Sequence, residues 1–175
     1  VLTAEAGQRL TADLFPNDDS VRLTVRDAAG DFVMGQVTPT LWVGELPASG
    51  DYLIRVYGDE TAVNPTDYPL NVNIPARISF EPGAVSATVS GSLAARQSVD
   101  YILRAQAGQT MDVVIESDTD NVLLTIVGAD GIPLTNGLMS GAMAWTGQLP
   151  ATQDYILRAI GTFDPTDFSL TVTIE

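Results

Sequence analysis

Residues 44–56 read GELPASGDYLIRV, and residues 147–159 read GQLPATQDYILRA, so one pattern recurs 103 positions further along the chain. The similarity extends on both sides of this pair. The other matched stretches are 2–8 with 103–109, 21–25 with 122–126, and 64–74 with 164–174. Repetition at a nearly constant offset indicates a tandem duplication. We therefore expect two related domains, residues 1–75 and residues 76–175.

Both copies have the sequence pattern of β-strands. Residues 70–74 and 170–174 alternate apolar and polar side chains, which is the period of a half-buried strand. Similar short runs recur about every ten residues, with Gly, Pro, Asn and Asp between them. The sequence predicts an all-β fold of two tandem antiparallel, jelly-roll-like β-sandwich domains. Gly in the Ala-Gly-Gln stretches at 6–8 and 107–109 is expected to provide the positive φ of hairpin turns.

Two stretches of the second copy resemble the bacterial pre-peptidase C-terminal domain family. They are DYILRAQAGQTM at 100–111 and LPATQDYIL at 149–157. The resemblance covers all of the second copy and most of the first, and it rests on spaced apolar and turn residues. It implies β-sandwich modules of secreted proteins, and hence an extracellular or cell-surface location. Some relatives bind calcium or collagen through acidic clusters, which have no residue-by-residue match in this sequence.

The charge balance restricts the partners of the protein. The chain has 22 acidic residues and eight basic ones, all of them arginine, for a net charge of −14. Such a charge repels the phosphates of nucleic acids and the head groups of anionic lipids. No apolar run reaches the ~20 residues of a membrane-spanning helix. We therefore expect neither nucleic acid binding nor membrane insertion, and the lack of a signal-like opening indicates a mature or truncated start at Val1.

The composition also argues against catalysis. Cysteine and histidine are absent, so the chain has no thiol nucleophile and lacks the commonest general base. We predict that the protein is not an enzyme and has no catalytic residues. No cofactor is expected, apart from a weak candidate Ca²⁺ site at Asp118 and Asp120, with Asp18 and Asp19 in the equivalent loop. Trp42 and Trp145 are expected in the core.

The two copies differ in length. Copy two begins with about 25 residues, 76–101, that have no counterpart in copy one, and stretches 77–80 and 84–93 of this leading segment have strand-like patterns. The first domain is therefore predicted to lack its leading strand or strands. Each buried backbone group left unpaired would cost about 1–3 kcal/mol. Three explanations remain open: a piece of a longer array, a shorter domain that covers its own edge, or a strand from another subunit.

Outward positions that are charged in copy one are apolar in copy two. Strands that are apolar on both faces are usually covered on both faces. Another subunit, or copy one of the same chain, would provide that cover. The predicted interface residues are Val114, Leu123, Val127, Ile78, Phe80, Val85 and Val89.

Together these features favour a structural function. We expect a non-enzymatic subunit that assembles with copies of itself into a surface filament or array, with β-strand complementation between subunits. The alternative is an accessory polysaccharide- or protein-binding module of a secreted enzyme.

Overall fold

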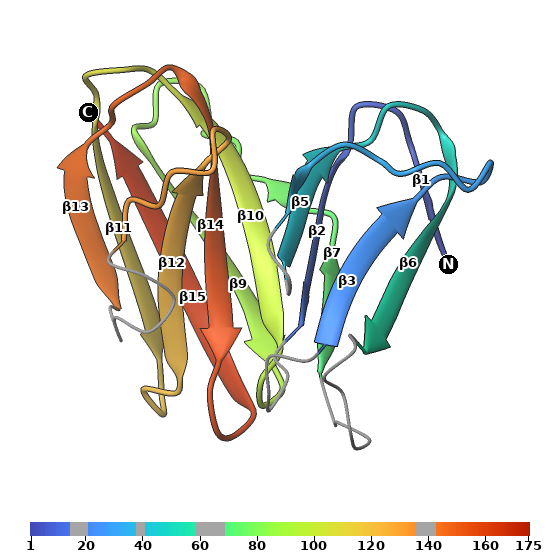
Figure 1. The fold of residues 1–175 in the computed structure, drawn as a ribbon. Coiled ribbons are helices and arrows are strands. Elements are labelled where there is room, and N and C mark those ends of the chain that lie inside the picture. Colours follow the sequence, from blue (N-terminus) through green and yellow to red (C-terminus); the bar gives the residue numbers. More distant parts are fainter. Residues whose placement is uncertain (15–20, 38–40, 59–68, 136–142) are drawn as a thin grey trace. The chain divides into compact units, whose positions relative to one another are not determined.

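The computed structural model of the chain describes residues 1–14, 21–37, 41–58, 69–135 and 143–175. Every regular element in these ranges is a β-strand (Figure 1), and the predicted all-β class is confirmed. Contacts divide the chain into two compact units, Val1–Ile74 (unit 1) and Pro75–Glu175 (unit 2). No helix in the described ranges has the length and apolar character that a membrane span requires.

Unit 1 is a sandwich of two sheets with strand orders β1-β6-β3 and β4-β5-β2-β7. Both sheets contribute to one core, in which Leu23 and Tyr52 of the first sheet pack with Leu10 and Trp42 of the second. The strands are β1 (Leu2–Ala4), β2 (Arg9–Leu14), β3 (Val21–Arg26), β4 (Gln36–Val37), β5 (Leu41–Glu45), β6 (Gly50–Gly58) and β7 (Leu70–Asn73).

Unit 2 is a larger sandwich with strand orders β12-β14-β10-β8 and β13-β11-β15-β9. Its strands are β8 (Ala76–Arg77), β9 (Ser86–Leu93), β10 (Ser98–Ala105), β11 (Thr110–Ser117), β12 (Val122–Gly128), β13 (Ala144–Gln148), β14 (Gln153–Gly161) and β15 (Thr166–Ile174). Its pairs are antiparallel, except that the two-residue β8 runs parallel to β10. Leu103, Leu124 and Leu157 of one sheet meet Val113 and Leu170 of the other in the core.

The duplication extends to the register of the strands. Leu2 lies opposite Tyr52 in unit 1, and its equivalent Leu103 lies opposite Tyr155 in unit 2. The other equivalent pairs are Ala12–Trp42 with Val113–Trp145, Ala12–Val72 with Val113–Val172, and Leu23–Val56 with Leu124–Ala159. Because a shift of one residue would turn every core side chain outward, this agreement shows that both copies use one framework.

The repeated Leu-Pro stretch carries the chain from one sheet to the other. We call residues 46–52 and 149–155 the crossing loops. In unit 2 the Leu149 amide donates to Gln109 O at 2.8 Å, and Gly108 N donates back to Leu149 O at 2.9 Å. Leu46 makes the equivalent pair of bonds in unit 1. The turns at 6–8 and 107–109 thus join strands of opposite sheets, so they are not the predicted hairpins, although Gly108 has the expected positive φ of 85°.

A tyrosine closes each crossing loop. The Tyr155 hydroxyl donates to Ala151 O at 2.6 Å and accepts from Ala151 N at 3.3 Å. Tyr52 makes the same two contacts with Ala48, at 2.5 and 3.3 Å. Both rings are buried, and Leu46 and Leu149 are buried with them. One side chain therefore fills the core and satisfies the loop backbone at the same time.

The repeated Trp-x-Gly pattern has a packing reason. Trp42 is buried and Trp145 is half-buried, and both indoles pack on the core of their unit. Each ring lies over the glycine two residues further along the strand. A methyl group at Gly147 would lie 2.6 Å from Cζ2 of Trp145, and one at Gly44 would lie 2.7 Å from Cη2 of Trp42. The glycine leaves room for the indole.

The described residues of unit 1 contain no equivalents of β8 and β9, and the incompleteness of copy one stays a prediction. The leading segment of unit 2 contributes β8 beside β10 and β9 beside β15. In unit 1, β1 is the equivalent of β10 and β7 is the equivalent of β15. No strand of the described residues lies beside β1 where β8 would be, or beside β7 where β9 would be.

We expected copy one to pair with a strand donated from outside residues 1–75. Among the described residues, no strand pair of this kind is found. β1 pairs with β6, and β7 pairs with β2, both within unit 1. Leu70, Val72 and Ile74 are 36–38% exposed along this edge. Water can satisfy the outer backbone groups of such short edge strands, which removes the energetic need for a donor.

Replacing Tyr155 by Phe tests the crossing loop. The ring still fills the core, but Ala151 loses both hydrogen bonds, so the free energy of unfolding of unit 2 should fall by about 1–2 kcal/mol in urea denaturation. The matched control is Tyr57→Phe, because Tyr57 is exposed and its hydroxyl makes no hydrogen bond to described residues. Equal stability of the two variants would contradict this role of Tyr155.

Candidate functional site

Unit 2 contains an open pocket of about 570 Å³ at one end of its sandwich. The pocket is formed by the β8–β9 connection, the β10–β11 turn, the crossing loop and the end of β15. Its lining residues are Phe80, Ala84, Val85, Arg104, Ala105, Gln106, Gln109, Thr152 and Ile174. Five of these nine residues are apolar and four are polar or charged, so the pocket combines apolar surface with a polar rim.

Hydrogen bonds hold the segments around the pocket together. Ile174 N donates to Val85 O at 2.8 Å, which joins the β8–β9 connection to β15. Ala107 N donates to Thr152 Oγ1 at 2.9 Å, which joins the turn to the crossing loop. The turn that follows β12, at residues 128–132, is connected to the same end, since Ala129 N donates to Asp154 O at 2.8 Å. We call this group of connected loops the pocket end of unit 2.

The polar rim has side-chain hydrogen-bond donors that are not used within the described residues. Gln109 Oε1 accepts from Gln106 N at 2.7 Å, and Thr152 Oγ1 accepts from Ala107 N. These contacts use acceptor atoms, so the Gln109 amide and the Thr152 hydroxyl retain their protons for another group. Arg104 contributes a guanidinium, which has donors alone. The rim is therefore suited to a ligand with acceptor atoms.

Arg104 differs from the other arginines of the described residues. It is exposed, and its side chain makes no hydrogen bond, ion pair or ring contact within the described ranges. The carboxylate directly opposite, on Asp154, instead binds Arg77 at 3.3 Å. Every other arginine has a partner of some kind. The pocket thus contains an unneutralised positive charge in a chain of net charge −14.

Unit 1 does not repeat this site. Thr3 is the equivalent of Arg104, and its hydroxyl donates to Asp51 at 2.6 Å. Glu5 stands in place of Gln106, and no residue of unit 1 aligns with Phe80 or Val85. The described residues of unit 1 therefore do not repeat the pocket.

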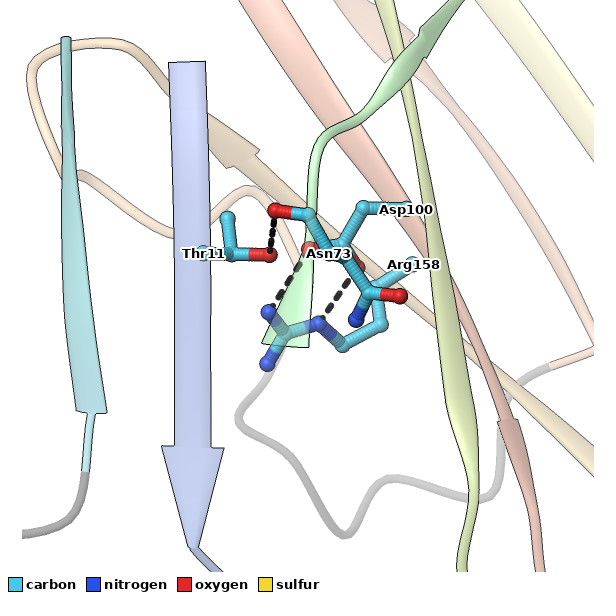
Figure 2. Close-up of polar contacts among 4 residues, drawn as sticks. All are labelled: Thr11, Asn73, Asp100 and Arg158. Carbon is cyan, nitrogen blue, oxygen red and sulfur yellow. Dashed lines mark hydrogen bonds and ion pairs between the residues drawn. The ribbon is translucent and has the colours of Figure 1, made fainter. Parts of the chain in front are cut away.

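A buried ion pair lies on the outward face of β10 and β14 in unit 2. Arg158 donates to Asp100 from Nε at 2.6 Å and from a terminal nitrogen at 2.8 Å (Figure 2). The Asp100 side chain is fully buried and that of Arg158 is 8% exposed. The equivalent Arg55 of unit 1 is exposed, and no described residue of unit 1 aligns with Asp100. In unit 1, Thr11 donates to the Asn73 carbonyl at 3.5 Å, between β2 and β7 (Figure 2).

These groups do not form a catalytic arrangement. Asp100 is engaged by Arg158, and the pocket offers donors without a general base beside a nucleophile. Burial raises the pKa of the Tyr101 phenol above its ordinary value, so this hydroxyl stays neutral near pH 7. Tyr101 packs edge-on against Phe168 at 6.4 Å between ring centroids, as a core residue does.

The predicted interface residues lie in several parts of unit 2. Phe80 and Val85 line the pocket, whereas Ile78 lies in the core. Val89 is half-buried against the core. On the remaining strands Val114 is 37% exposed, and Leu123 and Val127 are half-buried. The structure brings two of the seven together, and their role as an interface stays a prediction.

The calcium hypothesis also stays a prediction. Asp118 and Asp120 are exposed in the turn between β11 and β12, where Asp120 has a positive φ of 52°. No three acidic side chains of the described residues converge as a metal site would need. Asp18 and Asp19 lie outside the described residues.

The polar residues of the pocket were not predicted. Arg104, Gln106, Gln109 and Thr152 come from three segments, and no short motif connects them. One signal was present in the sequence, since Arg104 replaces the Thr3 of copy one within an otherwise similar stretch. Differences between duplicated copies therefore mark positions that the shared framework does not require.

Comparison with solved structures finds that part of this chain is similar to inhibitors of g-type lysozyme. Aeromonas hydrophila PliG, a periplasmic inhibitor of g-type lysozyme, matches with a TM-score of 0.51 and 26% identity, over 59% of this chain and 97% of the PliG chain. Salmonella Typhimurium PliG matches with a TM-score of 0.46 and 22% identity, over 59% and 97% of the two chains. No protein-family model matches the sequence. No curated protein matches it either. The resemblance to pre-peptidase C-terminal domains stays a prediction.

These comparisons correct the predicted function and partners. PliG inhibits a different protein, g-type lysozyme, so the similar structure is neither a subunit of a homopolymer nor an accessory module of an enzyme. The filament or array, assembly with copies of itself, strand donation between subunits and the accessory module were therefore wrong predictions. They rested on the unpaired edge of copy one, whose short strands require no donor.

Removing Asp100 tests the buried ion pair. Asp100→Asn removes the carboxylate charge that Arg158 contacts through two nitrogens, so the free energy of unfolding should fall by about 3–5 kcal/mol in urea denaturation. Adding Arg158→Met should restore much of the loss, because an apolar side chain then replaces the buried guanidinium. The control Asp164→Asn alters an exposed carboxylate and should change stability by less than about 0.5 kcal/mol. A loss no larger than that of the control would contradict the role of this pair.

Proposed function

We propose that this chain is a non-enzymatic, exported protein that binds and inhibits a lysozyme of the g type. The observation that carries the proposal is the match to Aeromonas hydrophila PliG, which covers 97% of that inhibitor at 26% identity. PliG is periplasmic, which favours a location outside the cytoplasmic membrane for this chain as well. The net charge of −14 would accelerate association with a positively charged partner.

Unit 2 is the better candidate for the inhibitory unit. Fifty-nine per cent of 175 residues is about 103 residues, more than the 74 residues of unit 1 and close to the length of unit 2. Within unit 2 we assign the contact to the pocket end. Its loops are connected by hydrogen bonds to one another, so little conformational entropy would be lost when a partner binds.

A lysis assay tests this function. The purified chain should slow the clearing of a peptidoglycan suspension by g-type lysozyme, and should leave an unrelated c-type lysozyme unaffected. Inhibition should weaken at high salt, because the acidic surface contributes to association. Full g-type activity in the presence of a large molar excess of the chain would refute the proposal.

Two exposed apolar residues at opposite ends of unit 2 provide matched variants. Ile132 is 58% exposed beside the Asp130–Gln153 hydrogen bonds of the pocket end. Phe163 is 83% exposed at the other end, next to Thr162, whose amide donates to Asn121 O. Ile132→Ser should weaken inhibition about fivefold or more, as loss of an apolar anchor does, whereas Phe163→Ser should not. The reverse result would move the contact to the opposite end.

A further inference from the structure

The pocket of unit 2 has the properties of a small-ligand site. Its volume of about 570 Å³ lies within the range of about 300–1,000 Å³ that is typical of such sites. We propose that it binds an apolar carboxylate, a ligand in which a carboxylate group is attached to a short apolar chain. This inference is independent of lysozyme inhibition, so failure of the lysis assay would leave it standing.

The rim determines the polar part of the ligand. The acceptor atoms of Gln109 and Thr152 already accept backbone N–H groups, so these side chains offer donors to a ligand. Arg104 adds a guanidinium, whose planar fork of donors matches the two oxygens of a carboxylate. Gln106 adds an amide that can donate as well as accept. The rim therefore favours an anion with acceptor oxygens through the charge of Arg104.

The positive charge of Arg104 is available to such an anion. Asp154, opposite Arg104 on the neighbouring strand, is bound to Arg77. Glu81 and Glu175 are exposed close to the pocket in sequence, and neither pairs with an arginine among the described residues. Because the chain as a whole repels anions, attraction has to come from this local group. The remaining contribution to ligand binding would come from contact with the apolar lining residues.

The lining residues of the leading segment and of β15 determine the apolar part of the ligand. Phe80 and Val85 face the pocket from the β8–β9 connection, and Ile174 from the end of β15. Val85 is 57% exposed, so a ligand has apolar area to cover. Burial of that area stabilises the complex at about 25 cal/mol per Å². An aliphatic chain next to the carboxylate uses both parts of the site.

An NMR titration of the full chain with N-acetyl-L-leucine tests the proposal. The amide signals of Gln106, Gln109 and Thr152 should shift, and N-acetyl-L-leucinamide, which lacks the charge, should bind about tenfold more weakly. Hexanoate distinguishes the source of the carboxylate. Equal binding of hexanoate assigns the pocket to simple aliphatic acids, and weaker binding assigns it to the carboxyl-terminal residue of peptides.

Variants separate the pocket from general effects of charge. Arg104→Met keeps the aliphatic stem and should weaken N-acetyl-L-leucine binding about tenfold. Arg55→Met removes an exposed arginine of unit 1 and should have no effect. Val85→Glu adds a negative charge at the pocket and should abolish binding of the carboxylate. This variant tests the location of the site separately from the contribution of Arg104. Equal binding of the carboxylate and the amide, or shifts confined to residues outside the pocket, would overturn the proposal.

Discussion

The crossing loop is the constraint on which the rest of the structure depends. In a sandwich the chain has to pass from one sheet to the other while every buried backbone N–H and C=O group keeps a hydrogen-bond partner. In each unit a buried leucine exchanges two backbone hydrogen bonds with the opposite turn, and a buried tyrosine hydroxyl satisfies an N–H and a C=O of the loop. Since these residues also belong to the core, the loop sets the register of the strands on both sides. This combined role explains why the stretch is so similar in both copies.

With the framework fixed, the differences between the copies arise from the leading segment. That segment gives unit 2 its two additional strands, the buried carboxylate of Asp100, and the Phe80 and Val85 side of the pocket. The described residues of unit 1 form the same framework without these parts; its edge strands β1 and β7 are short, and its Arg55 is exposed. Within the described residues, the two sandwiches thus differ mainly by this segment and by the pocket that it helps to form.

The fold was predictable because its determinants repeat in the sequence. Alternation in 170–174, the duplicated crossing loop and the extra 76–101 segment predicted two sandwiches with a shortened first copy. The prediction of a donated strand failed because it treated the backbone groups of β1 and β7 as buried, whereas exposed edge strands can bind water. The pocket was not predictable, since Arg104, Thr152 and Val85 meet only after three segments have folded.

Hydrogen exchange of the chain with and without g-type lysozyme is the most direct test of the central claim, that unit 2 binds its partner through the pocket end. The account predicts slower amide exchange in the complex at the β10–β11 turn, the crossing loop 149–155 and the turn around Asp130 that follows β12. Exchange at the Asp118–Asn121 turn, at the other end of unit 2, should be unchanged. Protection confined to unit 1, or to that opposite end, would contradict the account.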